Sequence, residues 1–364
     1  MISFTPSEEQ SLIIETVRRY ATERMQPAAH DADELARTPT EIIDKGWELG
    51  LLPNAIPETY GGFGEEHSAV TGVLAAEELA YGDLSMGFYL LTPNLLAIPV
   101  LHCGTEEQKQ QWLPRLTDAE FFPATAAMIE PRWNFDPYKL ETTAEKQGDG
   151  YVINGHKSYV PLADKAEVIL VYAREGDQTQ AFIVEKDTAG VSVLDEEKHM
   201  GLRALPTYEV KLENVKVPAA ARLGGEKGCD LEMLLNYSRV ALTGMAVGLA
   251  RGSYEYALKY AKEREAFGQP IAQKQAIAFL LAEMAIEIEA TQLLALEAAW
   301  ELDQGKDATR TAMLAKHYAD ESVLFVTDRA VQVLGGHGYI REHPSERWLR
   351  NGRGFTTFLG MAMV

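Results

Sequence analysis

The chain has 364 residues and a formal net charge of −20, from 34 basic and 54 acidic side chains. This acidic balance predicts that neither nucleic acid nor an anionic membrane is a partner, because both attract basic surfaces. No run of 18 apolar residues indicates a membrane-spanning helix, and the first residues do not have the pattern of a signal peptide. With only two cysteines, Cys103 and Cys229, we expect a cytoplasmic protein without disulfides.

The first third of the chain predicts helices. The pattern from Thr5 to about Leu116 is helical, and further helices are expected over residues 38–51, 68–81 and 105–116, each opening on a capping hydroxyl. The segment from Thr105 to Gln108 fits a capping box, in which the two ends of the first turn satisfy each other's backbone N–H groups.

The pattern changes to a period of two between about residues 121 and 223. Short segments rich in β-branched and aromatic residues predict strands at 143–146, 151–153, 168–172, 181–184 and 208–217. Gly148-Asp149-Gly150 is a favourable hairpin turn between the first two of these strands. This region therefore predicts a small antiparallel β domain.

Long helical stretches follow at about residues 230–263, 273–304 and 307–334. Helices of this length, joined by short loops, are typical of an up-and-down bundle. The chain is therefore helical, then β, then helical again, and we place the domain boundaries at 1–118, 119–226 and 227–364.

Short motifs recur through all three regions. Each is weak alone, but their order and spacing are specific. They read Pro57-Glu58-x-Tyr60-Gly61-Gly62, Gly104-Thr105-x-Glu107-Gln108-Lys109, Ile153-Asn154-Gly155-His156-Lys157, Met200-Gly201-x-Arg203, Tyr260-Ala261-x-x-Arg264-x-x-Phe267-Gly268-x-Pro270-Ile271 with Gln275, Gln332-x-x-Gly335-Gly336-x-Gly338-Tyr339, and Pro344-x-Glu346-Arg347-x-x-Arg350. Over essentially its whole length the chain resembles the acyl-CoA dehydrogenase flavoproteins.

The resemblance implies a fold and a chemistry. The expected fold is α+β but mainly α: a helical N-terminal domain, a small antiparallel β-barrel-like middle domain and a C-terminal four-helix bundle that drives assembly as a dimer of dimers. The expected chemistry is FAD-dependent oxidation of a CH–CH bond in an acyl-CoA thioester, as in fatty acid metabolism. A glutamate takes the α-proton, and the flavin accepts a hydride.

The glutamate is missing from both positions at which the resemblance places it. Leu359 stands at the usual position, and Ser238, before Arg239, stands at the alternative one. Neither side chain can take a proton from carbon, so we expect no catalytic base. His337 and His343 have no partner at metal-ligand spacing, so we also expect no metal site.

The resemblance further implies that each flavin lies between two subunits. Four replacements fall on the side that would hold the chain's own flavin. Ile129 stands in place of the expected threonine, and Asn134-Phe135 in place of Gly-Ser. Tyr159-Val160-Pro161 stands in place of Trp-x-Thr, and Met361 in place of the threonine after the base. Pro161 has no backbone donor. Tyr159 can still stack on a flavin in place of tryptophan, which keeps independent flavin binding open.

The residues that would reach a neighbouring subunit's flavin are the ones that the resemblance leads us to expect. Arg264 can hydrogen-bond a diphosphate, and Gly335-Gly336 allows close approach of the backbone. The cofactor-binding residues predicted there are Arg264, Phe267, Gln275, Gln332, Gly335 and Gly336.

Three hypotheses follow for function. The first is a base-less acyl-CoA dehydrogenase subunit that works with a catalytically complete paralogue and shares its FAD. The second is a flavoenzyme of the same fold with altered chemistry, such as monooxygenation or base-free elimination. The third is a non-enzymatic acyl-CoA-binding scaffold. The chain is thus expected either to share FAD or to bind it alone, in a homo- or hetero-oligomer.

Overall fold

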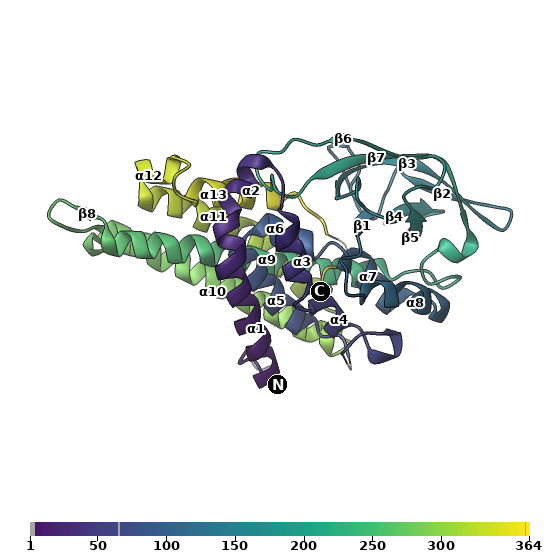
Figure 1. Ribbon diagram of the computed structural model, residues 1–364, viewed down its shortest axis with the longest axis horizontal. Coiled ribbons are helices and arrows are strands. Elements are labelled where there is room, and N and C mark those ends of the chain that lie inside the picture. The colour runs from purple at the N-terminus through teal and green to yellow at the C-terminus, as the bar shows by residue number, and fades with distance from the viewer. Residues whose placement is uncertain (1–3, 65, 361) are drawn as a thin grey trace.

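The computed structural model describes residues 4–64, 66–360 and 362–364. Met361, one of the expected flavin-side replacements, lies outside the described residues. Most helices occupy the left and centre of the molecule, and the strands of the middle region gather at the upper right (Figure 1). The predicted order of a helical region, a β region and a second helical region is confirmed.

The N-terminal region is a layer of short helices around a buried core. Ser7 caps the first helix in a capping box with Gln10, and the predicted capping box of Thr105 and Gln108 is confirmed. Ser68 caps α5 through the N–H of Thr71. The helices are α1 Glu8–Tyr20, α2 Gln26–Leu35 after a π-turn at Ala21–Met25, α3 Thr40–Trp47, α4 Leu51–Ala55, α5 Ala69–Gly82, α6 Leu84–Leu90, α7 Asn94–Cys103 and α8 Glu106–Trp112.

The middle region is one curled sheet. Its strands are β1 Ala124–Ala127, β2 Thr143–Gln147, β3 Gly150–Pro161, β4 Val168–Glu175, β5 Gln178–Glu185, β6 Val191–Glu196 and β7 Thr207–Pro218. The strand order is β1-β4-β2-β3-β7-β6, and β5 pairs with β4. The predicted hairpin between β2 and β3 is confirmed, with Gln147 opposite Gly150 and Gly148 at a φ of 63°.

Two features of the middle domain differ from the prediction. The sheet curls into a half-barrel and does not close, because the edge strand β6 pairs with β7 alone. It is also not purely antiparallel, because β1 runs parallel to β4, with Ala124 opposite Val168. All four residues of β1 are buried, as parallel strands require when both faces of a sheet are covered.

The C-terminal region consists of long helices packed side by side. The bounds are α9 Leu231–Glu263, α10 Gln275–Asp303, α11 Thr309–Leu334, α12 Gly336–Tyr339 and α13 Ser345–Phe355, with a hairpin of β8 Glu265–Ala266 and β9 Gln269–Pro270. α9 packs against α10, α11 and α13, and also against α5 of the N-terminal region. The β8–β9 hairpin protrudes at one end of the molecule (Figure 1).

A buried ion network fixes the N-terminal helices to this bundle. Arg251 on α9 pairs with Glu77 and, at 2.7 Å, with Glu78, both on α5. Arg18 on α1 reaches Glu78 at 2.6 Å, and Gln292 on α10 donates to Glu77 at 2.9 Å. Four helices therefore meet at two carboxylates.

In the described part of the chain, no single helix is both long and apolar enough to cross a membrane. Only α6 and α7 taken together pass that test, and they are bent by 46° at the break between them.

Candidate functional site

Arg264 and the Gly335-Gly336 pair lie together at the end of the bundle. α9 ends at Glu263, where the N–H of Arg264 donates to Tyr260 O, and α11 ends at Leu334. The two ends enclose a cleft of about 440 Å³, called here the Arg264 cleft. Its lining residues are Tyr260, Arg264, Ile271, Val333, Leu334, Gly335, Gly336, His337 and Ile340.

The Arg264 cleft presents a guanidinium that no residue in the described part of the chain pairs with. The Arg264 side chain is exposed and has no ion pair or hydrogen bond with any residue that the structure describes. Gly335 has a φ of 58°, and a Cβ added to either glycine would meet no atom within 4 Å. An anionic group can therefore approach this backbone and the guanidinium together.

Among the lining residues that sequence reasoning missed, Tyr260 and His337 are the polar ones. The Tyr260 hydroxyl lies 3.0 Å from His337 Nδ1, and a parallel contact joins the Tyr256 hydroxyl to His343 Nδ1 at 2.7 Å. Tyr260 is one helical turn before Arg264, which is the signal that could have placed it on the same face. Contact with His337, 77 residues away, requires the fold.

The remaining residues predicted with Arg264 lie around the cleft and do not line it. Phe267 is 96% exposed on the β8–β9 hairpin, in the left-handed region at a φ of 56°. Gln275 opens α10, and Gln332 stands near the end of α11; both are exposed. All three side chains therefore face away from the chain's own core.

Three of the replacements on the other predicted flavin side lie together with Leu359. Ile129, Tyr159, Pro161 and Leu359 line one small cavity, called here the Phe358 cavity. Its other lining residues are Phe88, Leu95, Ala126, Met128, Phe358 and Gly360. Its volume is about 10 Å³, so it has room for about one water molecule.

Aromatic side chains fill this cavity. Phe88 and Phe358 are both buried, with ring centroids 5.0 Å apart, and Phe358 meets Tyr159 edge-on at 5.8 Å. Tyr159 stacks on His199 at 4.7 Å and adopts a φ of 55°. The Tyr159 N–H donates to Glu197 at 2.9 Å, which holds the ring in this place.

The two positions predicted to lack a base are neighbours in space. Ser238 on α9 is fully buried, and its hydroxyl has no partner among the described residues. It lies 3.1 Å from where a Cβ on Gly360 would stand, beside Leu359. Among the described residues that line the Phe358 cavity, none carries a carboxylate.

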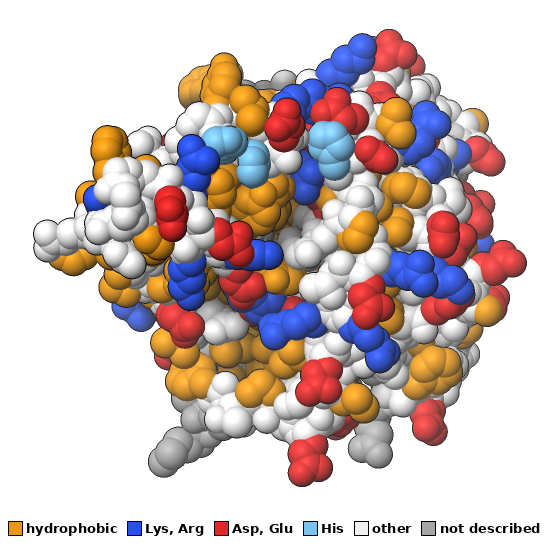
Figure 2. Space-filling view, turned by 60° about the vertical axis from the view of Figure 1, so that its left-hand side comes forward, with side chains coloured by type: hydrophobic (Ala, Val, Ile, Leu, Met, Phe, Trp, Pro, Cys, Tyr) orange, Lys and Arg blue, Asp and Glu red, His pale blue; other side chains and the backbone are white. Residues whose placement is uncertain are grey.

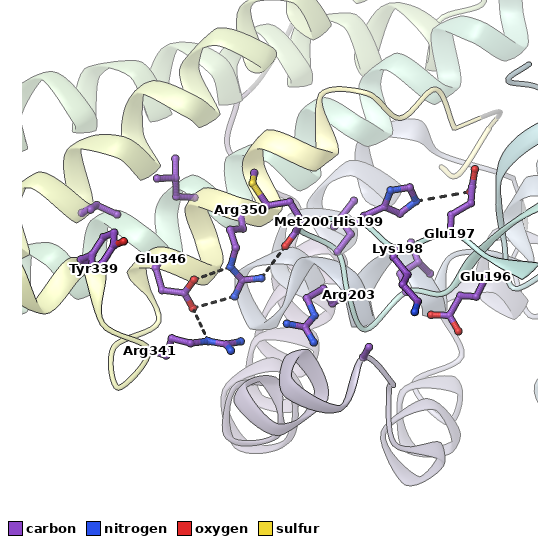
Figure 3. Close-up of a pocket in the computed structure, with 16 residues that line it drawn as sticks. Glu196, Glu197, Lys198, His199, Met200, Arg203, Tyr339, Arg341, Glu346 and Arg350 are labelled. Carbon is purple, nitrogen blue, oxygen red and sulfur yellow. Dashed lines mark hydrogen bonds and ion pairs between the residues drawn. The ribbon is translucent and has the colours of Figure 1, made fainter. Parts of the chain in front are cut away.

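A larger groove of about 950 Å³ lies between the β6–β7 connection and the α12–α13 region. Figure 3 shows that two of its arginines, Arg341 and Arg350, point toward Glu346. Arg350 binds Asp33 at 2.7 Å and Glu346 at 2.6 Å, and Arg341 binds Glu34 at 2.6 Å. Burial raises the pKa of Asp33, but the hydrogen bond and charge of Arg350 outweigh it and lower that pKa. These arginines mainly cross-link the domains.

A third polar cluster lies half-buried between α7, α9 and the loop before α5. His67 Nδ1 lies 3.2 Å from His102 Nε2, and His102 stacks on Tyr237 at 4.6 Å. Burial lowers the pKa of His67 to about 3 and that of His102 to about 4, so both are neutral at pH 7. Among the described residues, no group of three His, Cys, Asp or Glu side chains is arranged to hold a metal ion.

Comparison with known proteins identifies the family. The acyl-CoA dehydrogenase N-terminal, middle and C-terminal domains match residues 7–120, 125–215 and 229–363. The chain belongs to the acyl-CoA dehydrogenase family. Members of this family are flavoprotein oxidoreductases that act on acyl-CoA thioesters.

Individual members are similar along their whole lengths. The caffeyl-CoA reductase-Etf complex subunit CarC of Acetobacterium woodii is 37% identical, over 98% of this chain and 96% of its own. Butyryl-CoA dehydrogenase of Megasphaera elsdenii has a TM-score of 0.91 at 30% identity, covering 99% and 97%. Glutaryl-CoA dehydrogenase of Mycobacterium smegmatis, solved with FADH2, has a TM-score of 0.88 at 28% identity, covering 98% and 92%.

Proposed function

We propose that this member of the family is a base-less subunit of an FAD-dependent acyl-CoA dehydrogenase. It would complete the flavin site of a paralogous subunit that carries the glutamate. The observation that carries this proposal is the contrast between the open Arg264 cleft and the filled Phe358 cavity. The first is built to receive an anionic ligand, and the second has no space for a flavin ring.

Distance supports the assignment of the Arg264 cleft to another chain. Ser238 and Arg264 are 26 positions apart on and just beyond α9, which corresponds to about 39 Å along a helix axis. A ring placed beside Ser238 and Leu359 of the same chain would lie far from the Arg264 cleft. The cleft at the far end of α9 therefore fits a cofactor held mainly by a neighbouring subunit.

The residues of the Arg264 cleft fit the diphosphate half of FAD. Arg264 would donate charge-assisted hydrogen bonds, and the Gly335-Gly336 backbone would approach the phosphates. Phe267, Gln275 and Gln332 are exposed around the cleft, where a neighbouring subunit's cofactor would meet them. FAD bound there supplies the hydride acceptor, while this chain contributes binding and orientation.

The Phe358 cavity does not fit an isoalloxazine ring. Phe88, Phe358 and the Tyr159–His199 stack occupy the space between Ile129 and Leu359. Tyr159 therefore contacts His199 and Phe358 in place of a flavin, and its proposed role in flavin binding requires those rings to move. Proton removal from the acyl-CoA then depends on the paralogue, because neither Leu359 nor Ser238 can act as a base.

Assembly is supported by an unpaired apolar face. Phe279, Ile286 and Leu293 repeat every seven residues along α10 and are 58%, 64% and 43% exposed. Exposed apolar side chains in a row on one helix are a feature of surfaces that contact another subunit. On the face shown in Figure 2, acidic and basic side chains are interspersed, which suits contact with a protein of mixed charge. We propose a dimer of dimers in the cytoplasm, with a CoA thioester as substrate.

The test is flavin content in a mixed complex. The chain is co-expressed with a paralogue that carries glutamate at the Leu359 position, and bound flavin is measured by absorbance per heteromer. Arg264→Ala removes a hydrogen bond to a charged group, worth about 1.5–3 kcal/mol, so flavin affinity should fall roughly ten-fold or more. Arg310→Ala is the matched control, because Arg310 is exposed at the opposite end of α11.

Each outcome has a defined meaning. Loss of flavin with Arg264→Ala but not with Arg310→Ala supports the proposal. Wild-type flavin content with Arg264→Ala in every assembly contradicts it and leaves the Arg264 cleft structural. A yellow homotetramer of the chain alone would favour altered flavin chemistry, and a colourless homo-oligomer that binds CoA esters would favour a scaffold.

A further inference from the structure

A pocket of about 640 Å³ lies where the N-terminal helices meet the bundle, and it is called here the Arg347 pocket. Its lining residues come from α2, α5, α9, α13 and the loop before α13. None of them lines the Arg264 cleft or the Phe358 cavity. The Arg347 pocket is therefore separate from both parts of the proposed flavin site.

Arg347 is a buried cation that lines this pocket without a hydrogen bond to any residue that the structure describes. Its side chain is 9% exposed, and its Nε lies 3.9 Å from Oδ2 of Asp83, which is too far for a hydrogen bond. Asp83 uses its other oxygen to accept from the N–H groups of Ser85 and Met86, at 3.0 and 3.1 Å. A buried guanidinium without acceptors is costly, so an anion in the pocket would supply what Asp83 does not.

The first turn of α13 adds further donors at the same place. Pro344 lines the pocket at the N-cap position and provides no side-chain cap. The backbone N–H groups of residues 345–347 have no acceptor within the helix, and they carry the positive end of its dipole. The Ser345 hydroxyl in this turn is fully buried and has no partner among the described residues. Helix N-termini with free N–H groups are suited to phosphate.

The charged side chains of the pocket favour an anion on a chain that is otherwise acidic. Three lining residues are basic and two are acidic, against a net charge of −20 for the whole chain. The basic residues are Lys259, Arg341 and Arg347, and the acids are Glu255 and Glu342. Lys259 is exposed on α9 and has no ion pair with any residue in the described ranges. Two cations from different helices, Lys259 and Arg347, are therefore free to bind a ligand.

The volume and the aromatic walls of the pocket indicate a ligand larger than a phosphate ion. Sites for small molecules typically have volumes of about 300–1,000 Å³. Tyr81, Tyr256 and Trp348 line the pocket, and the rings of Tyr256 and Trp348 are 5.6 Å apart. The Tyr256 hydroxyl lies 2.7 Å from His343 Nδ1, which fixes that ring. The pocket thus combines an anion-binding end with an apolar aromatic surface.

We propose that the Arg347 pocket binds a small organic phosphate. The phosphate oxygens accept from Arg347, Lys259 and the first N–H groups of α13. The organic part rests on the aromatic side chains. Because the ligand contacts helices of both helical regions, its binding also stabilises their junction.

The test is binding of phenyl phosphate, inorganic phosphate and phenylacetate to the full chain, measured by calorimetry at pH 8 in a phosphate-free buffer of low ionic strength. At this pH a phosphate ester is a dianion. We expect one phenyl phosphate per chain. Inorganic phosphate lacks the aromatic part, and phenylacetate lacks one charge and one acceptor oxygen, so each should bind about ten-fold more weakly.

Two variants locate the anion. Lys259→Met removes one charged donor and should weaken phenyl phosphate binding about ten-fold. Lys262→Met is the matched control, because Lys262 is exposed on the same helix but does not line the pocket. Arg347→Lys keeps a cation beside Asp83 but removes the planar fork, and it should cause a loss of about the same size. Because Lys259 is exposed, Lys259→Met decides the question even if Arg347→Lys does not fold.

The proposal is overturned if phenyl phosphate does not bind, or if Lys259→Met and Lys262→Met bind it equally well. It is also overturned if phenylacetate binds as tightly as phenyl phosphate, because the pocket would then not select a phosphate. Binding that is lost in Arg264→Ala but kept in Lys259→Met would place the anion in the Arg264 cleft and overturn it as well. None of these measurements involves flavin or a paralogue, so the proposed function is supported or rejected separately, by its own experiment.

Discussion

Removing Arg251 should expose how strongly the N-terminal helices depend on the buried ion network. The side chains of Glu77 and Glu78 are only 3% exposed, and that of Arg251 is 15% exposed. Arg251 also lies over the Tyr81 ring, 4.6 Å from its centroid. In Arg251→Met, Glu78 keeps Arg18, but Glu77 keeps only the Gln292 amide. Breaking one partner of a buried pair costs about 3–5 kcal/mol, and we expect a loss of that size at pH 8.

The pH dependence of that loss has a definite sign. Burial raises the pKa of Glu77, and Arg251 opposes this, so removing Arg251 raises it further. A carboxyl group with a raised folded-state pKa is most stabilising when protonated, and that contribution is lost as the pH rises through the folded-state pKa. The deficit of Arg251→Met should therefore be smaller at pH 5.5 than at pH 8.

Urea unfolding followed by circular dichroism at both pH values measures the deficit, with Arg310→Met as an exposed control on α11. A deficit below about 1 kcal/mol at pH 8, or an equal deficit at the two pH values, would refute the reasoning.

Two further predictions concern catalysis and assembly. The isolated chain should not oxidise butyryl- or octanoyl-CoA when an electron acceptor is supplied. Leu359→Glu should remain as inactive as Leu359→Gln, because a general base, which raises a rate by about 10²–10⁴-fold, cannot act where the Phe358 cavity leaves no room for a flavin ring. Robust turnover by Leu359→Glu would show that the chain can bind its own flavin productively. Ile286→Asp, at a 64% exposed site on α10, should dissociate the oligomer in light scattering yet change subunit stability by no more than about 0.5 kcal/mol. Unchanged mass would rule out this face as the interface.

Local signals predicted much of the fold. The capping groups of Ser68 and Thr105, and the Gly148-Asp149 turn, act within a few residues and are visible in the sequence. The helices α6 and α7 were missed because almost all of their residues are buried, so neither shows a period that separates helix from strand. β1 was missed because Ala-Thr-Ala-Ala has weak strand propensity. Its parallel pairing with β4 is non-local.

In the candidate site too, local motifs could be predicted from the sequence and contacts between distant segments could not. Arg264, Gly335 and Gly336 were found through the order of motifs, and the structure brings these three together in one cleft. The sequence did not show that Phe358 reaches Phe88, 270 positions earlier, or that Asn94 holds the Met363 carbonyl. Substitutions at Ile129 and Pro161 indicated only that hydrogen bonds were absent. The structure shows in addition that aromatic rings occupy the space.

The asymmetry between the two sites constrains the assembly that this chain can form. In a homodimer, each Arg264 cleft would face the filled Phe358 cavity of an identical chain, and an arginine without an anion would stay solvated. In a heterodimer, the cleft would instead face a paralogue with room for the ring, and one flavin would serve the pair. A flavin held from both sides adds its binding free energy to the assembly that contains it. The cofactor would therefore favour the unequal pair over the equal one, even if the apolar face of α10 did not distinguish between the two partners.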